Sequence, residues 1–175
     1  MFLIEPKVHG DQRGYFLETY RQDRFFDETG KNIQFIQDNE SKSQRGVLRG
    51  LHYQLPPFAQ NKLVRVVDGE VLDVAVDVRV GSPYFGQHVF AFLSGENKHQ
   101  LFIPSGFAHG FIVLSETAVF SYKVDKLYAP EYEHAIKWND KNIGIDWPVK
   151  EPMLSEKDSK APSLESISKE MLPIF

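Results

Sequence analysis

One strongly alternating segment constrains the fold more than any other part of the chain. In "EVLDVAVDVR", residues 70–79, apolar side chains occupy every second position from Leu72 to Val78. Successive side chains of a β-strand point to opposite faces, so the apolar residues share one face and Asp73 and Asp77 share the other. The segment is therefore predicted to form a half-buried strand.

Similar short apolar segments recur along the chain between turn-forming residues. They include "KLVRVV", "HVFAFL", "QLFIP", "GFIVL" and "AVFSYKV", and the breaks between them include "DGE", "GSPYFG" and "PSGFAHG". Several short strands at regular spacing are typical of an all-β sandwich or barrel. Helix is expected at two places only, in "YRQDRFFDET" before Gly30 and in "SLESISKEML" with Ser163 as its N-cap.

Length and charge limit the domain organisation and the classes of partner. A chain of 175 residues with 42% hydrophobic content suits one domain, residues 1–175, in which the proline-rich, charged segment 148–175 is interpreted as a C-terminal arm. The net charge of −4 gives no general attraction to nucleic acid or to a membrane. Because the chain has no cysteine and no long apolar run, we expect a cytoplasmic protein.

Two histidines stand where a metal site could be expected. "PSGFAHG", with His109, is similar to the second half of the metal-binding motif of cupins, but the would-be His-x-His pair reads "HYQ", with His52 followed by Gln54. One histidine and an amide make a poor metal site. We therefore expect no metal, which would leave the histidines available for proton transfer.

His52 lies close in sequence to two cations. Arg49 precedes it and Lys62 follows it on the next strand, and long cationic side chains beside a barrel interior are costly unless an anion binds there. If Tyr122 shares the inward face of Phe120, a phenol also enters the barrel. Taken singly, His52 is better explained as a packed histidine, and Tyr122 is explained equally well as an aromatic plug. Together these side chains favour carbon-acid chemistry on an anionic ligand.

Seven segments in order extend the similarity over nearly the whole chain. "EPKVHGDQRGYFLETY", "QDNESKS", "GVLRGLHYQ", "QNKLVRVVDGEVLDVAVDVR", "IPSGFAHGF", "WNDKNIGIDWP" and "LSEKD" resemble successive motifs of the dTDP-4-dehydrorhamnose 3,5-epimerases. The resemblance implies a metal-free, cofactor-free cupin jelly roll (a double-stranded β-helix) with a few short peripheral helices. It also implies a homodimer that epimerises a dTDP-4-keto-6-deoxyhexose on the route to L-rhamnose.

The resemblance assigns a role to each residue of the expected proton-transfer set. His52 is implied to be the base and Asp158 its partner, while Lys62 is implied to stabilise the enolate and Tyr122 to return a proton from the opposite face. These roles suit the residues, because removal of a proton beside a ketone requires a base and a stabilised enolate oxygen. Further residues match the positions that bind the nucleotide sugar in that family: Arg13, Glu18, Gln37, Asn39, Arg49, His109, Glu133 and Lys157. Tyr128 matches an aromatic residue that stacks on the thymine from the neighbouring subunit.

Two departures and three alternatives accompany the resemblance. His9 stands where members often have an aromatic ring, and His134 stands where a small residue is frequent, so base contacts could differ. A mono-epimerase acting at C3 or C5 of a related dTDP-ketosugar would carry nearly the same residues. A non-catalytic sugar-nucleotide-binding cupin would not need His52, Asp158, Lys62 and Tyr122 together. A metal-dependent cupin would need the missing His-x-His pair.

Overall fold

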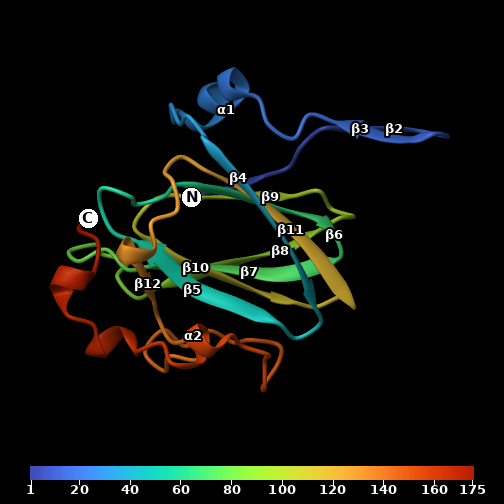
Figure 1. Cartoon of the computed structure of the whole chain (residues 1–175). Coiled ribbons are helices and arrows are strands. Elements are labelled where there is room, and N and C mark those ends of the chain that lie inside the picture. The colour runs from blue at the N-terminus through green and yellow to red at the C-terminus, as the bar shows by residue number, and fades with distance from the viewer.

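The computed structural model describes all 175 residues and consists mainly of two facing five-stranded antiparallel sheets (Figure 1). The first sheet has the order β1 (Phe2–Ile4), β9 (Gln100–Ile103), β6 (Lys62–Asp68), β11 (Thr117–Val124) and β4 (Gln37–Gln44). The second has the order β12 (Glu133–Ala135), β5 (Leu48–Gln54), β10 (Phe107–Val113), β7 (Glu70–Asp77) and β8 (His88–Ser94). Few neighbouring strands are consecutive in sequence, as in a jelly roll. The predicted all-β cupin fold is confirmed.

A separate hairpin and a few short helices lie outside the two sheets. The hairpin consists of β2 (Val8–Asp11) and β3 (Gly14–Leu17) and extends away from the barrel (Figure 1). The helices are α1 (Gln22–Thr29), α2 (Glu156–Ser159) and the 3₁₀ turns η1 (Pro130–Tyr132), η2 (Leu164–Ser166) and η3 (Lys169–Met171). None of the helices has the length and apolar character needed to cross a membrane.

The two helix predictions had different outcomes. The first is confirmed, because α1 occupies the expected segment and ends at Gly30 in the left-handed conformation that glycine tolerates. The second is wrong, because "SLESISKEML" forms only η2 and η3, and Ser163 makes no capping hydrogen bond. Long-range contacts hold this segment: Leu164 N donates to Asp140 Oδ2, and Met171 O accepts from the Tyr53 hydroxyl. These two hydrogen bonds prevent the segment from forming one continuous helix.

The protein has two main hydrophobic cores, one on each side of the second sheet. The lumen between the sheets contains Val64, Val66, Phe111 and Phe120 among its buried side chains. The outer face of the second sheet is covered by residues of the C-terminal region, including Trp147, Leu164 and Leu172. Figure 1 shows this orange and red region running along β5 and β10. The C-terminal arm therefore encloses the second core as well as reaching the site.

Strand β7 has a buried side chain at every position after its first residue. The prediction of a strand is confirmed, but the prediction that one of its faces is exposed is wrong. Leu72, Val74 and Val76 pack in the outer core, as alternation suggests, but Asp73 on the other face is fully buried toward the lumen. Both faces are covered because the C-terminal arm packs on one side and the first sheet on the other. The sequence pattern could not distinguish a lumen containing acids from solvent.

Strands β5 and β10 approach unusually closely beside two histidines. His52 and His109 are cross-strand neighbours, and the register shifts between His109 and Phe111. At this shift, a Cβ atom on Gly110 would lie 2.7 Å from Arg49 O and 3.1 Å from Gly50 Cα. Backbone atoms cannot yield as the end of a side chain can, so a glycine is required for this close approach.

We therefore expect Gly110→Ala to destabilise the protein by about 1 to 3 kcal/mol, as overpacking typically does, because β5 and β10 must separate. Thermal unfolding measures the loss. Gly10→Ala is the control, since the nearest atom to its added Cβ is 3.8 Å away on an exposed hairpin. Equal unfolding temperatures for the two variants would contradict the close-approach interpretation.

Candidate active site

Two adjoining cavities between the sheets share His52, Lys62 and Tyr122. Their volumes are about 440 and 270 Å³, a size that suits a small organic ligand. The larger is closed on one side by Met153 and Leu154 of the C-terminal arm. Eleven of the thirteen predicted site residues line one cavity or the other: Gln37, Asn39, Arg49, His52, Lys62, His109, Tyr122, Tyr128, Glu133, Lys157 and Asp158.

A short hydrogen bond joins His52 on β5 to Asp158 on α2. His52 Nε2 and Asp158 Oδ1 lie 2.5 Å apart, and Asp158 is only 3% exposed. Burial favours the protonated form of this carboxyl, but hydrogen bonds from His52 and Ser155 outweigh it and hold the Asp158 pKa below its usual range. The ionised carboxylate accepts the Nε2–H, so the lone pair of the neutral ring is on Nδ1. This is the arrangement of an oriented base.

The local sequence "SEKD" explains how Asp158 is held. Ser155 is the N-cap of α2, and its hydroxyl accepts a hydrogen bond from the Asp158 backbone N–H at 3.0 Å. A serine followed three residues later by an acid is a typical helix start. The cap fixes the first turn, and the side chain of Asp158 then points to β5.

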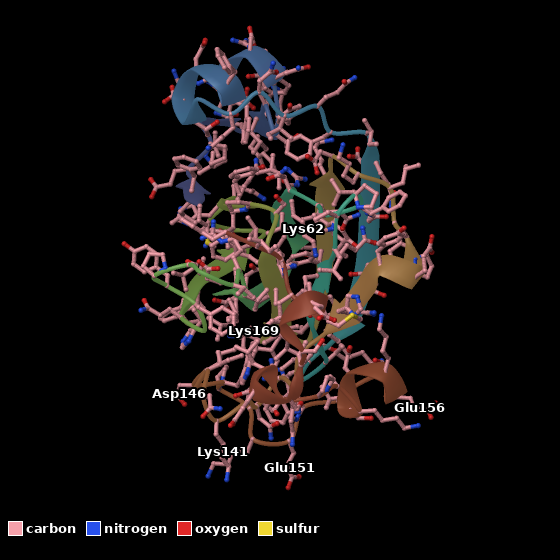
Figure 2. All side chains as sticks on the ribbon, turned by 90° about the vertical axis from the view of Figure 1, so that its left-hand side faces the viewer. Lys62, Lys141, Asp146, Glu151, Glu156 and Lys169 are labelled. Carbon is pink, nitrogen blue, oxygen red and sulfur yellow. The ribbon has the colours of Figure 1, made fainter.

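Lys62 and Tyr122 reach the cavities from the opposite sheet to His52. Lys62 begins β6 and Tyr122 lies on the neighbouring β11, whereas His52 belongs to the second sheet. In Figure 2, Lys62 lies in the middle of the molecule, whereas Lys141 and Glu151 lie at its periphery. Tyr122 points inward with Phe120, as predicted, since both line the larger cavity. A ligand between the sheets would have an imidazole on one side and a phenol on the other.

Burial shifts the titration of both of these groups. It lowers the pKa of Lys62 to about 8, although the carboxylates of Glu133 and Asp73 oppose the shift. It also raises the pKa of Tyr122, with a further contribution from Glu133. Tyr122 therefore remains a protonated donor at neutral pH, and the charge of Lys62 depends on its neighbours.

His109 is bound to a carboxylate that the sequence analysis did not assign to the site. Its Nε2 lies 2.9 Å from Oδ2 of Asp73, and both side chains are buried. Burial lowers the pKa of His109 despite the opposing effect of Asp73, so the ring is neutral at pH 7. The only signal for Asp73 in the sequence was an acid within the apolar run "EVLDVAVDV".

Tyr128, Glu133 and Lys157 form a connected group beside the smaller cavity. The Tyr128 hydroxyl donates to Glu133 Oε2 at 2.8 Å, and the Lys157 ammonium donates to the same oxygen. Burial raises the pKa of Glu133, but these two hydrogen bonds outweigh it and the net pKa is lowered. The group connects the C-terminal arm to β12, so any anion that binds Lys157 must compete with Glu133.

Gln54 stands where a second histidine ligand is absent. Its side-chain amide forms hydrogen bonds with backbone groups of two loops. Its Oε1 accepts from Ala129 N at 2.8 Å, and its Nε2 donates to Phe58 O at 2.7 Å and to Leu127 O at 3.2 Å. The amide therefore fixes the loop that carries Tyr128. Nowhere in the chain do three or more histidine, aspartate or glutamate side chains gather so that they could hold a metal ion.

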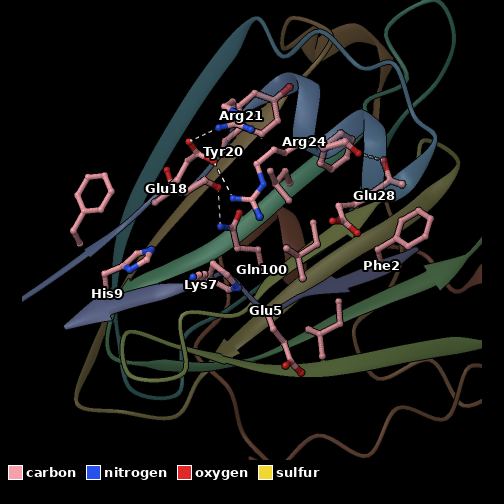
Figure 3. Close-up of a pocket in the computed structure, with 18 residues that line it drawn as sticks. Phe2, Glu5, Lys7, His9, Glu18, Tyr20, Arg21, Arg24, Glu28 and Gln100 are labelled. Carbon is pink, nitrogen blue, oxygen red and sulfur yellow. Dashed lines mark hydrogen bonds and ion pairs between the residues drawn. The ribbon is translucent and has the colours of Figure 1, made fainter.

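Arg13 and Glu18 lie away from the two cavities in this chain. Arg13 lies between β2 and β3, where its side chain is 89% exposed and pairs with Asp11. Glu18 lines a separate hollow of about 530 Å³ between α1, β1 and the barrel, where it faces Arg21 and Arg24 (Figure 3). The fold therefore does not bring these two predicted site residues to His52 within one chain.

Known proteins are similar to this chain over nearly its whole length. The family model for dTDP-4-dehydrorhamnose 3,5-epimerase matches residues 1–166. A Shigella flexneri protein named dTDP-4-dehydrorhamnose 3,5-epimerase is 57% identical over 90% of this chain and 87% of its own. The structure of dTDP-6-deoxy-D-glucose-3,5-epimerase RmlC from Legionella pneumophila Philadelphia 1, in complex with dTDP-4-keto-L-rhamnose, superposes with a TM-score of 0.96. It has 52% identity and covers 99% of this chain and 92% of that one.

A mono-epimerase is also similar to this chain. ChmJ from Streptomyces bikiniensis, a 3'-monoepimerase in complex with dTDP-quinovose, superposes with a TM-score of 0.94 and 36% identity, over 99% of this chain and 88% of its own. The fold is therefore shared by enzymes that invert different numbers of carbons.

The role of Gln54 can be tested by removing its hydrogen bonds. Gln54→Leu leaves buried backbone groups without partners, each at a cost of about 1 to 3 kcal/mol. We expect a lower unfolding temperature and faster hydrogen exchange at the Ala129 amide, measured by NMR. Gln60→Leu, which loses one exposed bond to Lys126 O, is the control. Unchanged exchange at Ala129 in Gln54→Leu would contradict the assigned role.

Proposed function

The chain belongs to the dTDP-4-dehydrorhamnose 3,5-epimerase family, and from this premise we propose how its cavities act. The substrate is dTDP-4-dehydro-6-deoxy-D-glucose, and inversion at C3 and C5 gives dTDP-4-dehydro-L-rhamnose. Both carbons are adjacent to the C4 ketone, so removal of either proton produces an enolate on the same oxygen. One base, one acid and one group that stabilises the enolate can therefore serve both inversions.

The observation that supports this proposal best is the placement of base and acid on facing sheets. His52, oriented by Asp158, removes the proton with its Nδ1, and the carboxylate stabilises the resulting imidazolium. Tyr122 on the opposite sheet gives its hydroxyl proton to the other face of the same carbon. Inversion requires this arrangement, because return of the proton by His52 would restore the original configuration.

Lys62 is proposed to stabilise the negative charge that develops on O4. It lines both cavities, beside His52 and Tyr122. An ammonium group buried away from bulk water stabilises an oxyanion more strongly than it would in water. The side chain must be charged to act in this way, and its lowered pKa makes that charge sensitive to pH.

The cationic and polar residues around this centre are proposed to hold the nucleotide. Arg49, which donates to Ser43 Oγ at 3.1 Å, has a forked group that suits a diphosphate. The Lys157 ammonium, which donates to Glu133 in this structure, is proposed to donate to a phosphate oxygen when the substrate binds. The remaining proposed contacts from this chain are Gln37, Asn39, His109 and Glu133.

A homodimer is proposed because two predicted site residues cannot reach their own cavities. Arg13 lies on a hairpin that extends from the barrel, and Glu18 directly follows it (Figure 1). This hairpin, which also exposes Phe16, is proposed to contribute to the site of a second copy. Tyr128, 54% exposed, is proposed to stack on the thymine held by its partner. Strand β8 also exposes Phe90 and Phe92, apolar area that a partner could cover.

The reaction can be followed by proton NMR of the ketosugar nucleotide in deuterated water. Tyr122→Phe retains the ring and the base but removes the phenolic donor. Enolate should still form, and His52 should return deuterium to the original face. We expect measurable exchange, with inversion reduced about 10²-fold or more.

His52→Asn is the matched variant for that experiment, because it removes the base and leaves the acid. Exchange and inversion should then fall together, by about 10²-fold to 10⁴-fold. Near-normal exchange in His52→Asn would identify another base. Inversion at one carbon only, by the unaltered protein, would indicate a mono-epimerase, and no exchange at all would favour a sugar-nucleotide-binding protein without catalysis.

Light scattering tests the oligomeric state under the conditions of the assay. We expect a mass about twice the 20.1 kDa of one chain. Arg13→Ala should weaken dTDP binding without changing this mass, since its exposed guanidinium is proposed to reach the partner's ligand. An active species with the mass of one chain would contradict the proposed dimer.

A further inference from the structure

Asp73 has a buried carboxyl group with only one oxygen paired. Burial raises its pKa, and the neighbouring His109 and Lys62 oppose that shift. Asp73 is fully buried on β7, and its Oδ2 pairs with His109 Nε2 at 2.9 Å. Its Oδ1 is the single buried side-chain oxygen or nitrogen in the protein without a hydrogen-bond partner. An unpaired buried carboxylate oxygen costs stability, so its retention calls for a functional explanation.

Lys62 is a buried cation without a directly paired anion. Its ammonium forms no ion pair, whereas the other two cations that line the cavities have partners: Lys157 pairs with Glu133, and Arg49 bonds to Ser43. Burial lowers the pKa of Lys62 to about 8, and only the carboxylates of Glu133 and Asp73 act against this shift. The charge that the reaction needs therefore depends on these two anions.

The groups around Lys62 come from every element that faces the cavities. The titratable and charged groups are Glu40 on β4, Arg49, His52 and Tyr53 on β5, Asp73 on β7, His109 on β10, Tyr122 on β11, Tyr128 before η1, Glu133 on β12, and Lys157 and Asp158 on α2. Of the four carboxylates, Glu40 is exposed on β4, Asp158 is engaged by His52, and Glu133 is engaged by Lys157 and Tyr128. Asp73 alone retains a buried oxygen with no partner.

We propose that Asp73 is a positioning residue, the buried counterion that keeps Lys62 in its ammonium form and holds the neutral His109 ring beside it. Oδ1 is the acceptor available to the ammonium, directly or through one water molecule. The inference rests on the proposed role of Lys62 at the enolate oxygen. Asp73 does not touch the reacting atoms; it acts through Lys62 and His109.

Asp73→Asn tests the charge without changing the shape, and the amide oxygen can still accept the His109 N–H. Removing the anion disfavours the ammonium, so the pKa of Lys62 should fall by about one unit or more. NMR of protein with ¹³C-labelled lysine Cε, titrated without substrate, measures this value directly. The alkaline limb of kcat/KM should move to lower pH by the same amount, so that the deficit grows as pH rises through 7 to 8.

Asp77→Asn is the matched control. Asp77 lies on the same strand and face and is 2% exposed, but its carboxylate pairs with Arg79 and Ser82. Its loss should lower the unfolding temperature and leave both the Lys62 titration and the pH profile unchanged. An equal shift in Asp77→Asn, or an unshifted Lys62 in Asp73→Asn, would overturn the inference.

Lys62→Met provides the reciprocal measurement if Asp73→Asn does not fold. Because coupling between two sites is mutual, loss of the ammonium should raise the pKa of Asp73, observed at ¹³Cγ. An unmoved Asp73 would overturn the proposal. The lysine and aspartate titrations need no substrate, so they remain decisive even if the unaltered protein fails to epimerise the ketosugar.

Discussion

The hydrogen bond between His52 and Asp158 connects the inside of the barrel to a residue 106 positions later in the chain. Its geometry depends on the Ser155 cap, on the packing of the C-terminal arm against the second sheet, and on the close approach of β5 and β10. A barrel that only bound a ligand would not need these features to hold a histidine against a buried acid. They are explained together if the ring of His52 must keep one tautomer and one orientation.

The lumen combines a hydrophobic core with a group of ionisable side chains that lie beside it. Phe111 and Phe120 stack at 4.0 Å beneath the cavity, while the charged ends of Lys62 and Asp73 are buried near them. Burial in a medium of low polarity makes unpaired charge costly, and it also strengthens every interaction with a charge that forms during reaction. The same surroundings therefore destabilise the empty site and favour the enolate.

Much of the architecture could be predicted from local patterns. Alternation located the strands, and the segment before Gly30 formed the expected helix. The family resemblance supplied thirteen predicted site residues, and eleven of them line two adjoining cavities. The failures share a cause, since each depended on what packs against a segment. The face of β7 that carries Asp73 is buried by the facing sheet, and the residues after Ser163 are held in 3₁₀ turns by contacts with Asp140 and Tyr53.

The sequence by itself determined the chemical identities: a histidine with a distant acid, a lysine, a tyrosine on an inward face, and glutamine in place of a second metal ligand. Only the tertiary structure decided their relations. It placed His52 and Tyr122 on opposite sheets, committed Gln54 to loop backbone, left one oxygen of Asp73 unpaired, and directed Arg13 away from its own cavity. The physical reason is that residue type and periodicity specify which groups a chain carries and which face each occupies. Burial, pairing and pKa depend on the elements that pack against that face.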